Sequence, residues 1–176
     1  MALLNDVIPV FCTAEIRGDV LDEFFLAAYS SPEFVNEGIH GDIAVLIHDT
    51  NTEGITHPTN PPVSKPTSCP FKNKTAEEIW NFAQENLRYP IFNRAIAILD
   101  EQTVVDKETC LLVTTWENPP SEQENGSALL TVRSDFRSAL VILNIKNLGI
   151  GGDEHFKNGK DAKGVIRLYQ RYDGGQ

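Results

Sequence analysis

Two groups of titratable side chains in the chain have the composition of acid–base sites. The first is the adjacent pair His48 and Asp49, and the second is the run Asp153, Glu154 and His155. A carboxylate beside a histidine can hold the proton of the imidazolium, which is the arrangement that general acid and base catalysis uses. We therefore take these five residues as the candidate catalytic residues.

Each group also has an ordinary structural explanation, and both alternatives stay open. The second group follows the segment 149–152, whose glycines allow positive φ and close approach of a ligand, but it can equally be an exposed polar turn after a helix. This segment is not a dinucleotide-binding fingerprint, because a helix is predicted before it where that motif requires a strand. It also lacks the Gly-Lys-Ser/Thr ending of a phosphate-binding loop. His48 and Asp49 can be turn residues at the end of a strand.

The sequence predicts neither a cofactor nor a metal. A metal site could in principle combine His48, His57 and His155 with a nearby aspartate, but the spacing puts no pair of ligands on one helix. No cofactor motif and no Gly-x-Ser-x-Gly elbow are present. Any chemistry would therefore consist of proton transfer and positioning.

The three cysteines, Cys12, Cys69 and Cys110, are too few and too widely spaced for a disulfide framework or a zinc motif. Cys12 and Cys110 fall within predicted strands, where we expect them to pack as small apolar side chains. Cys69 is the thiol that we expect to be exposed. No base stands beside it in the sequence to activate it, so we do not expect it to act as a nucleophile.

Hydrophobic periodicity places these groups on strands, helices and loops. The clearest helix begins with a capping box, Thr75 and Glu78. The run 136–147 could be a buried strand, but its length favours a helix. The polar segment 100–108 is predicted to link an antiparallel pair of strands. In full, strands are predicted over 7–13, 42–48, 95–99, 109–116, 128–132 and 164–169, and helices over 20–29 (capped by Asp19), 75–87 and 136–147.

Two polar, proline-containing segments are predicted to be loops inside one domain. The segment 50–74 contains five prolines and cannot be a central strand or a helix, and 117–127 is the second loop. A loop as long as 50–74 is usually a lid, a binding loop or an insertion. We expect residues 1–176 to form a single-domain α/β sandwich with a mixed β-sheet and about three helices. The long loop would cover His48 and Asp49 at the carboxyl end of their strand, where ligands bind in such sheets.

Three stretches of the chain resemble a small uncharacterised domain family of actinobacteria and filamentous fungi. They are the opening strand Pro9–Thr13 with the helix that follows, the central run from Ala95 through Asp100 to Val113, and the C-terminal pattern from Asn147 to Arg167. The resemblance implies an α/β fold and supplies no catalytic residue. Where the family has an Arg-Thr-Asp-Phe-like segment after its opening strand, this chain has Cys12-Thr13-Ala14-Glu15.

The charge balance excludes some partners. There are 15 Lys and Arg against 25 Asp and Glu, which gives a formal net charge of −10. A sequence-independent nucleic-acid binder needs excess cations, and so does a protein that adheres to anionic lipid, so neither partner is expected. No signal peptide or membrane span is recognised, and we expect a cytoplasmic protein. The oligomeric state is not indicated.

Two hypotheses for function remain, and the sequence leaves open whether the protein is an enzyme. We favour a small-molecule pocket that works as a cofactor-independent acid/base enzyme of the isomerase, cyclase or hydratase type. The alternative is a non-catalytic module that binds another protein through its acidic surface and its Pro-rich loop. A pocket that contains a histidine would favour the first hypothesis, and a flat surface the second.

Overall fold

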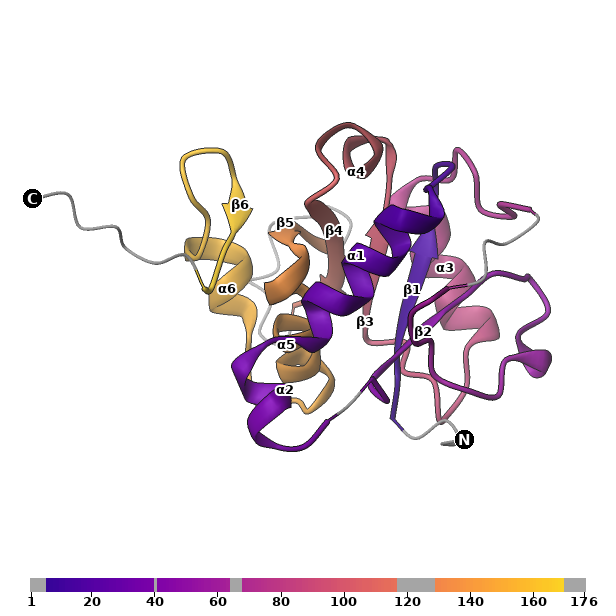
Figure 1. The fold of residues 1–176 in the computed structure, drawn as a ribbon, viewed down its shortest axis with the longest axis horizontal. Helices are drawn as coiled ribbons and strands as arrows, with labels where there is room; N and C mark the ends of the chain where they lie inside the picture. The colour runs from indigo at the N-terminus through magenta and orange to yellow at the C-terminus, as the bar shows by residue number, and fades with distance from the viewer. Residues whose placement is uncertain (1–5, 40, 64–67, 117–128, 170–176) are drawn as a thin grey trace, which may run out of the picture.

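A computed structural model describes residues 6–39, 41–63, 68–116 and 129–169. These residues form a six-stranded sheet with helices on both faces (Figure 1). The strands are β1 (Ile8–Cys12), β2 (Ala44–Leu46), β3 (Ala95–Leu99), β4 (Thr109–Thr115), β5 (Leu129–Asp135) and β6 (Val165–Ile166). The α-helices are α1 (Gly18–Tyr29), α2 (Pro32–Asn36), α3 (Ala76–Asn86), α4 (Glu101–Asp106), α5 (Phe136–Asn147) and α6 (Asp153–Asn158), and η1 (Thr52–Gly54) is a 3₁₀ turn.

The sheet is mixed, with the strand order β2-β1-β3-β4-β5-β6. β1 pairs in parallel with both β2 and β3, so that Val10 lies opposite Leu46 on one side and Ala97 on the other. β3, β4 and β5 are antiparallel to one another, and β6 is parallel to β5. The continuous apolar runs in the sequence are explained by this arrangement, because parallel strands are covered on both faces. The predicted mixed α/β fold is confirmed.

Side chains that alternate along β1 divide the core into two layers. Ile8 and Val10 belong to the apolar cluster formed with α1 and α5, whereas Phe11 belongs to the cluster formed with α3. This alternation is the period-two pattern of a strand. α1 and α5 therefore cover one face of the sheet and α3 covers the other, so the helices that connect β1 to β2 and β2 to β3 lie on opposite faces.

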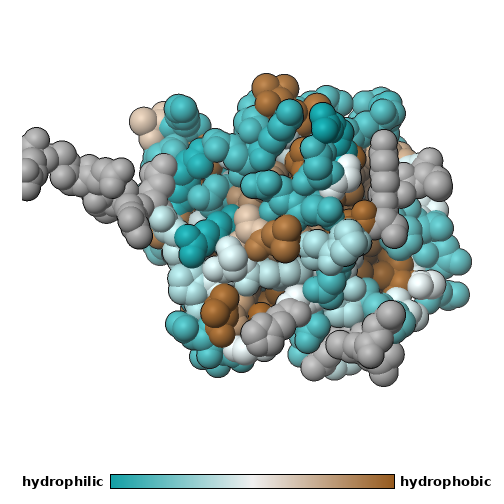
Figure 2. Space-filling model, in the orientation of Figure 1, coloured by the Kyte–Doolittle hydropathy of each residue, from teal (hydrophilic) through white to brown (hydrophobic). Residues whose placement is uncertain are grey.

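The outer surface is mainly hydrophilic on the face shown in Figure 2, where hydrophobic residues form small, separate patches. Among the described residues, no helix combines the length and the hydropathy that are needed to cross a membrane.

Local sequence signals explain how two of the three long helices, α3 and α5, begin. In α3, Thr75 accepts a hydrogen bond from the amide of Glu78 (3.2 Å), and the Glu78 carboxylate accepts one from the amide of Thr75 (2.8 Å), which confirms the capping box. The segment 136–147 is helical, as predicted, and Asp135 caps it. The prediction that Asp19 caps the first helix is wrong, because α1 begins at Gly18 and the Asp19 carboxylate pairs with Arg17 at 2.8 Å.

Several predicted boundaries change for physical reasons. The segment 100–108 is not only a polar link, because Asp100 caps the short helix α4 within it. The strand predicted over 42–48 is restricted to Ala44–Leu46, the residues that have partners in β1. The last strand is reduced to β6, which pairs with only two residues of β5. The predicted loop 117–127 lies outside the described residues, and so does Ala128, the first residue of the fifth predicted strand.

The described parts of the Pro-rich loop pack against the sheet and α1. The Thr59 amide donates to the carbonyl of Ala44 (2.9 Å), and its hydroxyl accepts from the amide of Leu46 (2.8 Å), so Thr59 covers the free edge of β2. Tyr29 of α1 donates its hydroxyl proton to the Thr59 carbonyl at 2.6 Å. On the far side of the loop, the Asn73 amide donates to the carbonyl of Thr13 (2.9 Å). The loop is therefore attached to the sheet at two places, along β2 through Thr59 and just after β1 through Asn73.

A half-buried ion pair connects β3, α4, β4 and β5. The Arg133 guanidinium on β5 donates to both carboxylate oxygens of Asp100, at 2.8 and 2.6 Å, and also to the hydroxyl of Thr109 on β4 (2.9 Å). Burial by itself would raise the pKa of Asp100, but the hydrogen bonds and charge of Arg133, with further hydrogen bonds from Thr103, outweigh it and lower this pKa. The ionised carboxylate thus stabilises the folded state.

We expect Asp100→Ala to lower the free energy of unfolding by about 2 kcal/mol, because it leaves a partly buried guanidinium with fewer partners. Urea denaturation followed by circular dichroism measures this change. Because the folded-state pKa of Asp100 is lowered, the carboxylate stabilises the fold at neutral pH. That stability is lost as the pH falls from the ordinary carboxyl pKa of about 4 through the lowered value.

The matched control is Arg17→Ala, which breaks an ion pair that is exposed on both sides. It should leave the urea midpoint unchanged. The interpretation is wrong if the difference in stability between the wild-type protein and Asp100→Ala does not shrink on acidification, or if Arg17→Ala destabilises the protein as much as Asp100→Ala does.

Candidate functional site

A cavity of about 320 Å³ opens at the carboxyl ends of β1 and β2. The connection from β1 to β2 runs through α1 on one face of the sheet, and the connection from β2 to β3 runs through α3 on the other. The loops therefore diverge at this point, which is where ligands bind in open α/β sheets. The lining comes from Cys12 and the segment 14–16 after β1, Leu21 of α1, the segment 46–48 at the end of β2, and the segment 68–72 of the Pro-rich loop.

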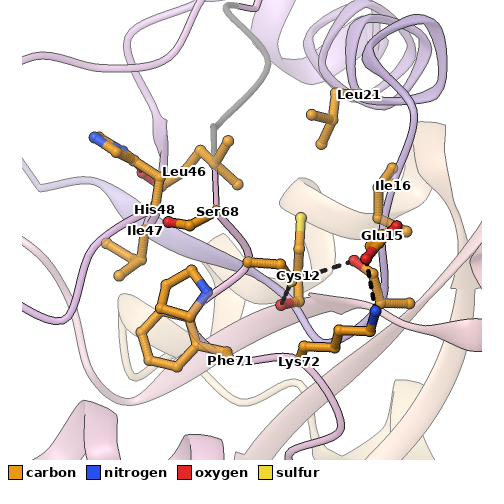
Figure 3. Close-up of a pocket in the computed structure, with 13 residues that line it drawn as sticks. Cys12, Glu15, Ile16, Leu21, Leu46, Ile47, His48, Ser68, Phe71 and Lys72 are labelled. Atoms are coloured by element: carbon orange, nitrogen blue, oxygen red, sulfur yellow. Dashed lines mark hydrogen bonds and ion pairs between the residues drawn. The ribbon is translucent and has the colours of Figure 1, made fainter.

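The cavity has an apolar base and one charged rim. Leu21, Leu46 and Phe71 are buried and supply the apolar surface. On one side Lys72 pairs with Glu15 at 2.6 Å, with both side chains partly exposed (Figure 3). The hydrogen bond and the charge of Glu15 raise the pKa of Lys72, so Lys72 is a cation at neutral pH. A ligand in the cavity would meet hydrocarbon at one end and a paired ammonium and carboxylate at the other.

His48 lies on the opposite side of this cavity. Its side chain is exposed, and in Figure 3 the imidazole ring points away from Cys12 and from the pair formed by Glu15 and Lys72. The ring Nδ1 is 3.2 Å from the carbonyl oxygen of Leu46. A carbonyl oxygen can only accept, so Nδ1 carries the proton in the neutral ring and Nε2 keeps its lone pair. His48 thus offers a proton acceptor at the rim of the cavity rather than in its interior.

Asp49 does not line the cavity, although it is adjacent to His48. Its carboxylate accepts a hydrogen bond from the backbone amide of Asn51 at 2.9 Å. This is the short-range bond by which an aspartate stabilises a turn. The structure therefore gives Asp49 a local structural role.

The second predicted group, Asp153–His155, lies in another part of the molecule. It forms the first turn of α6, which packs near β5 and lies away from β1 and β2 (Figure 1). Asp153 pairs at 2.6 Å with Lys146, whose side chain is 3% exposed, and Glu154 accepts from Asn158 at 2.8 Å. None of the three lines the cavity at β1 and β2. His48 and the segment 149–155 therefore do not face this cavity together. Where an exposed turn was one of the two alternatives, the chain forms a short helix that begins after Gly152 (φ 104°).

The structure instead brings together two cysteines that the sequence separates by 57 residues. Cys12 and Cys69 both line the cavity, and the Cys69 thiol donates to the carbonyls of Cys12 (3.3 Å) and Ala14 (3.5 Å). Cys69 was expected to be exposed, but it is half-buried. No local signal could have paired these residues, because their proximity depends on the path of the long loop. Cys110, as predicted, is buried in β4.

Burial changes the acidity of both thiols. It raises the pKa of Cys12 to about 12, with a further contribution from Cys69. Burial also raises the pKa of Cys69, although a backbone hydrogen bond and the charge of Lys72 counteract part of this effect. Both side chains are therefore protonated thiols at neutral pH. Within the described residues, no three His, Cys, Asp or Glu side chains are placed to hold a metal ion.

A second hollow, of about 470 Å³, lies at the opposite end of the sheet. It is formed by η1, the end of α3 and the segment 88–91, and Ile91 bridges to Val7 at the beginning of β1. Its lining is mainly polar. Because ligands of α/β sheets bind at the carboxyl ends of strands, we take the cavity beside Cys12 as the candidate site.

We expect Asp153→Ala to act on stability. The substitution removes a carboxylate that contacts the buried ammonium of Lys146, so the free energy of unfolding should fall by about 3 kcal/mol. Thermal and urea denaturation measure it. Glu154→Ala, in the same turn but exposed, is the control and should leave stability nearly unchanged. Equal effects of the two substitutions would contradict a structural role for the Asp153–Lys146 pair.

Comparison of the chain with models of protein families, with curated proteins and with solved structures finds no match. The cavity at the carboxyl ends of β1 and β2 and the side chains that line it are therefore the features from which a function can be inferred.

Proposed function

We propose that the protein binds a small molecule in the cavity at the carboxyl ends of β1 and β2. The observation that carries this proposal is the position of the cavity, which lies where the loops after two parallel strands diverge. Its volume of about 320 Å³ is at the lower end of the range for small-molecule sites. The apolar base and the single charged rim are also typical of such sites.

The lining defines a class of ligand. The cavity suits a compact molecule with an apolar body that contacts Leu21, Leu46 and Phe71. A polar or anionic group on the same molecule would reach Lys72, which can share its ammonium protons between Glu15 and a ligand. We therefore expect the ligands to be small aliphatic or aromatic molecules with one polar head group.

The alternative, a protein-binding module, would need the Pro-rich loop to be available as a recognition strip. Its described parts are instead bonded to β2, α1 and the segment after β1, through Thr59, Val63 and Asn73. This favours a loop that forms a wall of the pocket. The relationship to the domain family stays a proposal, and it suggests no activity for this protein.

Ser68→Trp tests the proposal, because Ser68 is exposed at the rim and a large side chain there would fill the cavity without disturbing the core. We expect fragments with an apolar body and one carboxylate to bind the wild-type protein, as detected by saturation-transfer NMR. The affinity should fall at least roughly tenfold in the variant, which corresponds to a loss of about 1.4 kcal/mol in the free energy of binding.

Asn158→Trp is the matched control, since it adds the same side chain at an exposed position on α6. It should bind the same fragments with unchanged affinity. If no fragment of this class binds the wild-type protein, or if both variants bind equally well, the cavity is not a ligand site.

Acid–base catalysis at this site is the finer proposal, and the tautomer of His48 favours it. With Nδ1 bonded to the Leu46 carbonyl, Nε2 is left as a general base at the rim. A carbonyl compound held in the cavity could then lose a proton from the carbon beside its carbonyl group to Nε2. This is the first step of a cofactor-independent isomerisation or hydration–dehydration.

Exchange of such protons for deuterium in D₂O, followed by NMR on those binding fragments that also carry a keto group, measures this step without a known product. We expect His48→Ala to lower the exchange rate by at least roughly a hundredfold, the usual contribution of a general base. His155→Ala should leave the exchange rate unchanged. If wild-type protein binds the fragments but does not catalyse exchange, the protein is a binder and not an acid–base enzyme.

A further inference from the structure

Cys12 and Cys69 both line the wall of one cavity. Cys12 is the last residue of β1, and Cys69 lies in the loop segment that returns to the end of this strand. The Cys69 sulfur is 3.3 Å from the carbonyl oxygen of Cys12. A carbonyl oxygen lies about 2.4 Å from its own Cα, so the Cys69 sulfur lies within about 6 Å of the Cα of Cys12.

This placement is compatible with a covalent bond between the two sulfurs. A disulfide needs Cα atoms that are about 4.4–6.8 Å apart and side chains directed toward each other. The bound of about 6 Å joins the Cys69 sulfur, not its Cα, to the Cα of Cys12. The two side chains line the same cavity, and the segment that carries Cys69 is already held against the end of β1 by the hydrogen bond from Asn73 to Thr13. To form the bond, the Cys69 side chain and its loop must turn toward the Cys12 sulfur, because Cys12 is fixed in the sheet.

We propose that Cys12 and Cys69 form an oxidisable pair that a peroxide converts into a disulfide across the wall of the cavity. In the first step the Cys69 thiolate attacks hydrogen peroxide, the O–O bond breaks, and the sulfur becomes a sulfenic acid while hydroxide leaves and is protonated to water. In the second step Cys12 loses its proton and attacks the sulfenic sulfur, which expels a second hydroxide that also becomes water. In total, two thiols and one peroxide give one disulfide and two waters, and two electrons pass from sulfur to oxygen.

The surroundings assign different roles to the two sulfurs. Cys69 is the first to react, because it lies on the loop and the charge of Lys72 offsets part of the rise that burial causes in its pKa. Cys12 is more deeply buried in the sheet and acts as the resolving cysteine. Because burial raises both pKa values, oxidation is slow at neutral pH and speeds up as the thiols ionise. This proposal does not depend on the identity of any ligand of the cavity.

The test treats the folded wild-type protein with hydrogen peroxide, blocks remaining thiols under denaturing conditions, and identifies the products by intact-mass and peptide mass spectrometry. We expect loss of two hydrogen atoms, a disulfide-linked peptide that contains Cys12 and Cys69, and blocking of Cys110 alone. The rate should rise roughly tenfold with each pH unit while the pH stays below the thiol pKa.

Cys110→Ala is the matched control, because it removes the third thiol, and it should form the same disulfide at the same rate. Cys12→Ala should instead accumulate sulfenic or sulfinic acid at Cys69, with no disulfide. The proposal fails if Cys12 and Cys69 are both still blocked after oxidation, if Cys110 is found in the disulfide, or if wild-type Cys69 is converted to sulfinic acid without a link. All three contradicting outcomes are measured on the wild-type protein, so they can be interpreted even if a variant folds poorly.

Discussion

The constraint on which the rest of this structure depends is the complete enclosure of β1. Its backbone is paired on both edges, with β2 and β3, and its side chains are packed on both faces, against α1 and α5 on one side and α3 on the other. A strand enclosed in this way must leave the sheet at its carboxyl end. The chain therefore leaves the sheet just after Cys12, between the layer of α1 and the layer of α3. The cavity, its charged rim and the hydrogen bond from the Cys69 thiol to the Cys12 carbonyl all lie at this exit.

The elements that depend on local sequence could be predicted. The three long helices lie where the helical spacing of apolar residues places them, and the capping box of Thr75 and Glu78 marks the start of α3, because such signals act over a few positions. The helix over 136–147 was ambiguous only because α5 is buried on most of its surface. The short elements α4 and α6 were missed, because one or two turns of helix depend on caps and neighbours more than on a hydrophobic pattern.

The candidate site could be predicted only in part, and for a definite reason. Placing His48 at the carboxyl end of a buried strand was enough to find the edge of the sheet where the cavity lies. The other residues of the site come together through contacts that span more than fifty positions, such as Lys72 with Glu15 and Cys69 with Cys12. Adjacent titratable residues in the sequence, such as Asp153 to His155, proved a weaker guide, because their carboxylates bond to Lys146 and Asn158 within their own region.

The cover that Thr59 provides for β2 has a consequence for how the sheet meets other chains. An open edge strand offers a row of unpaired amides and carbonyls on which a foreign strand can grow. One edge of this sheet is β2, whose backbone is already hydrogen-bonded to Thr59. The other edge is β6, which is only two residues long and is bridged to Lys160. Among the described residues, the sheet thus gives a neighbouring polypeptide little room to extend it. The covered edges protect the chain against strand-by-strand association.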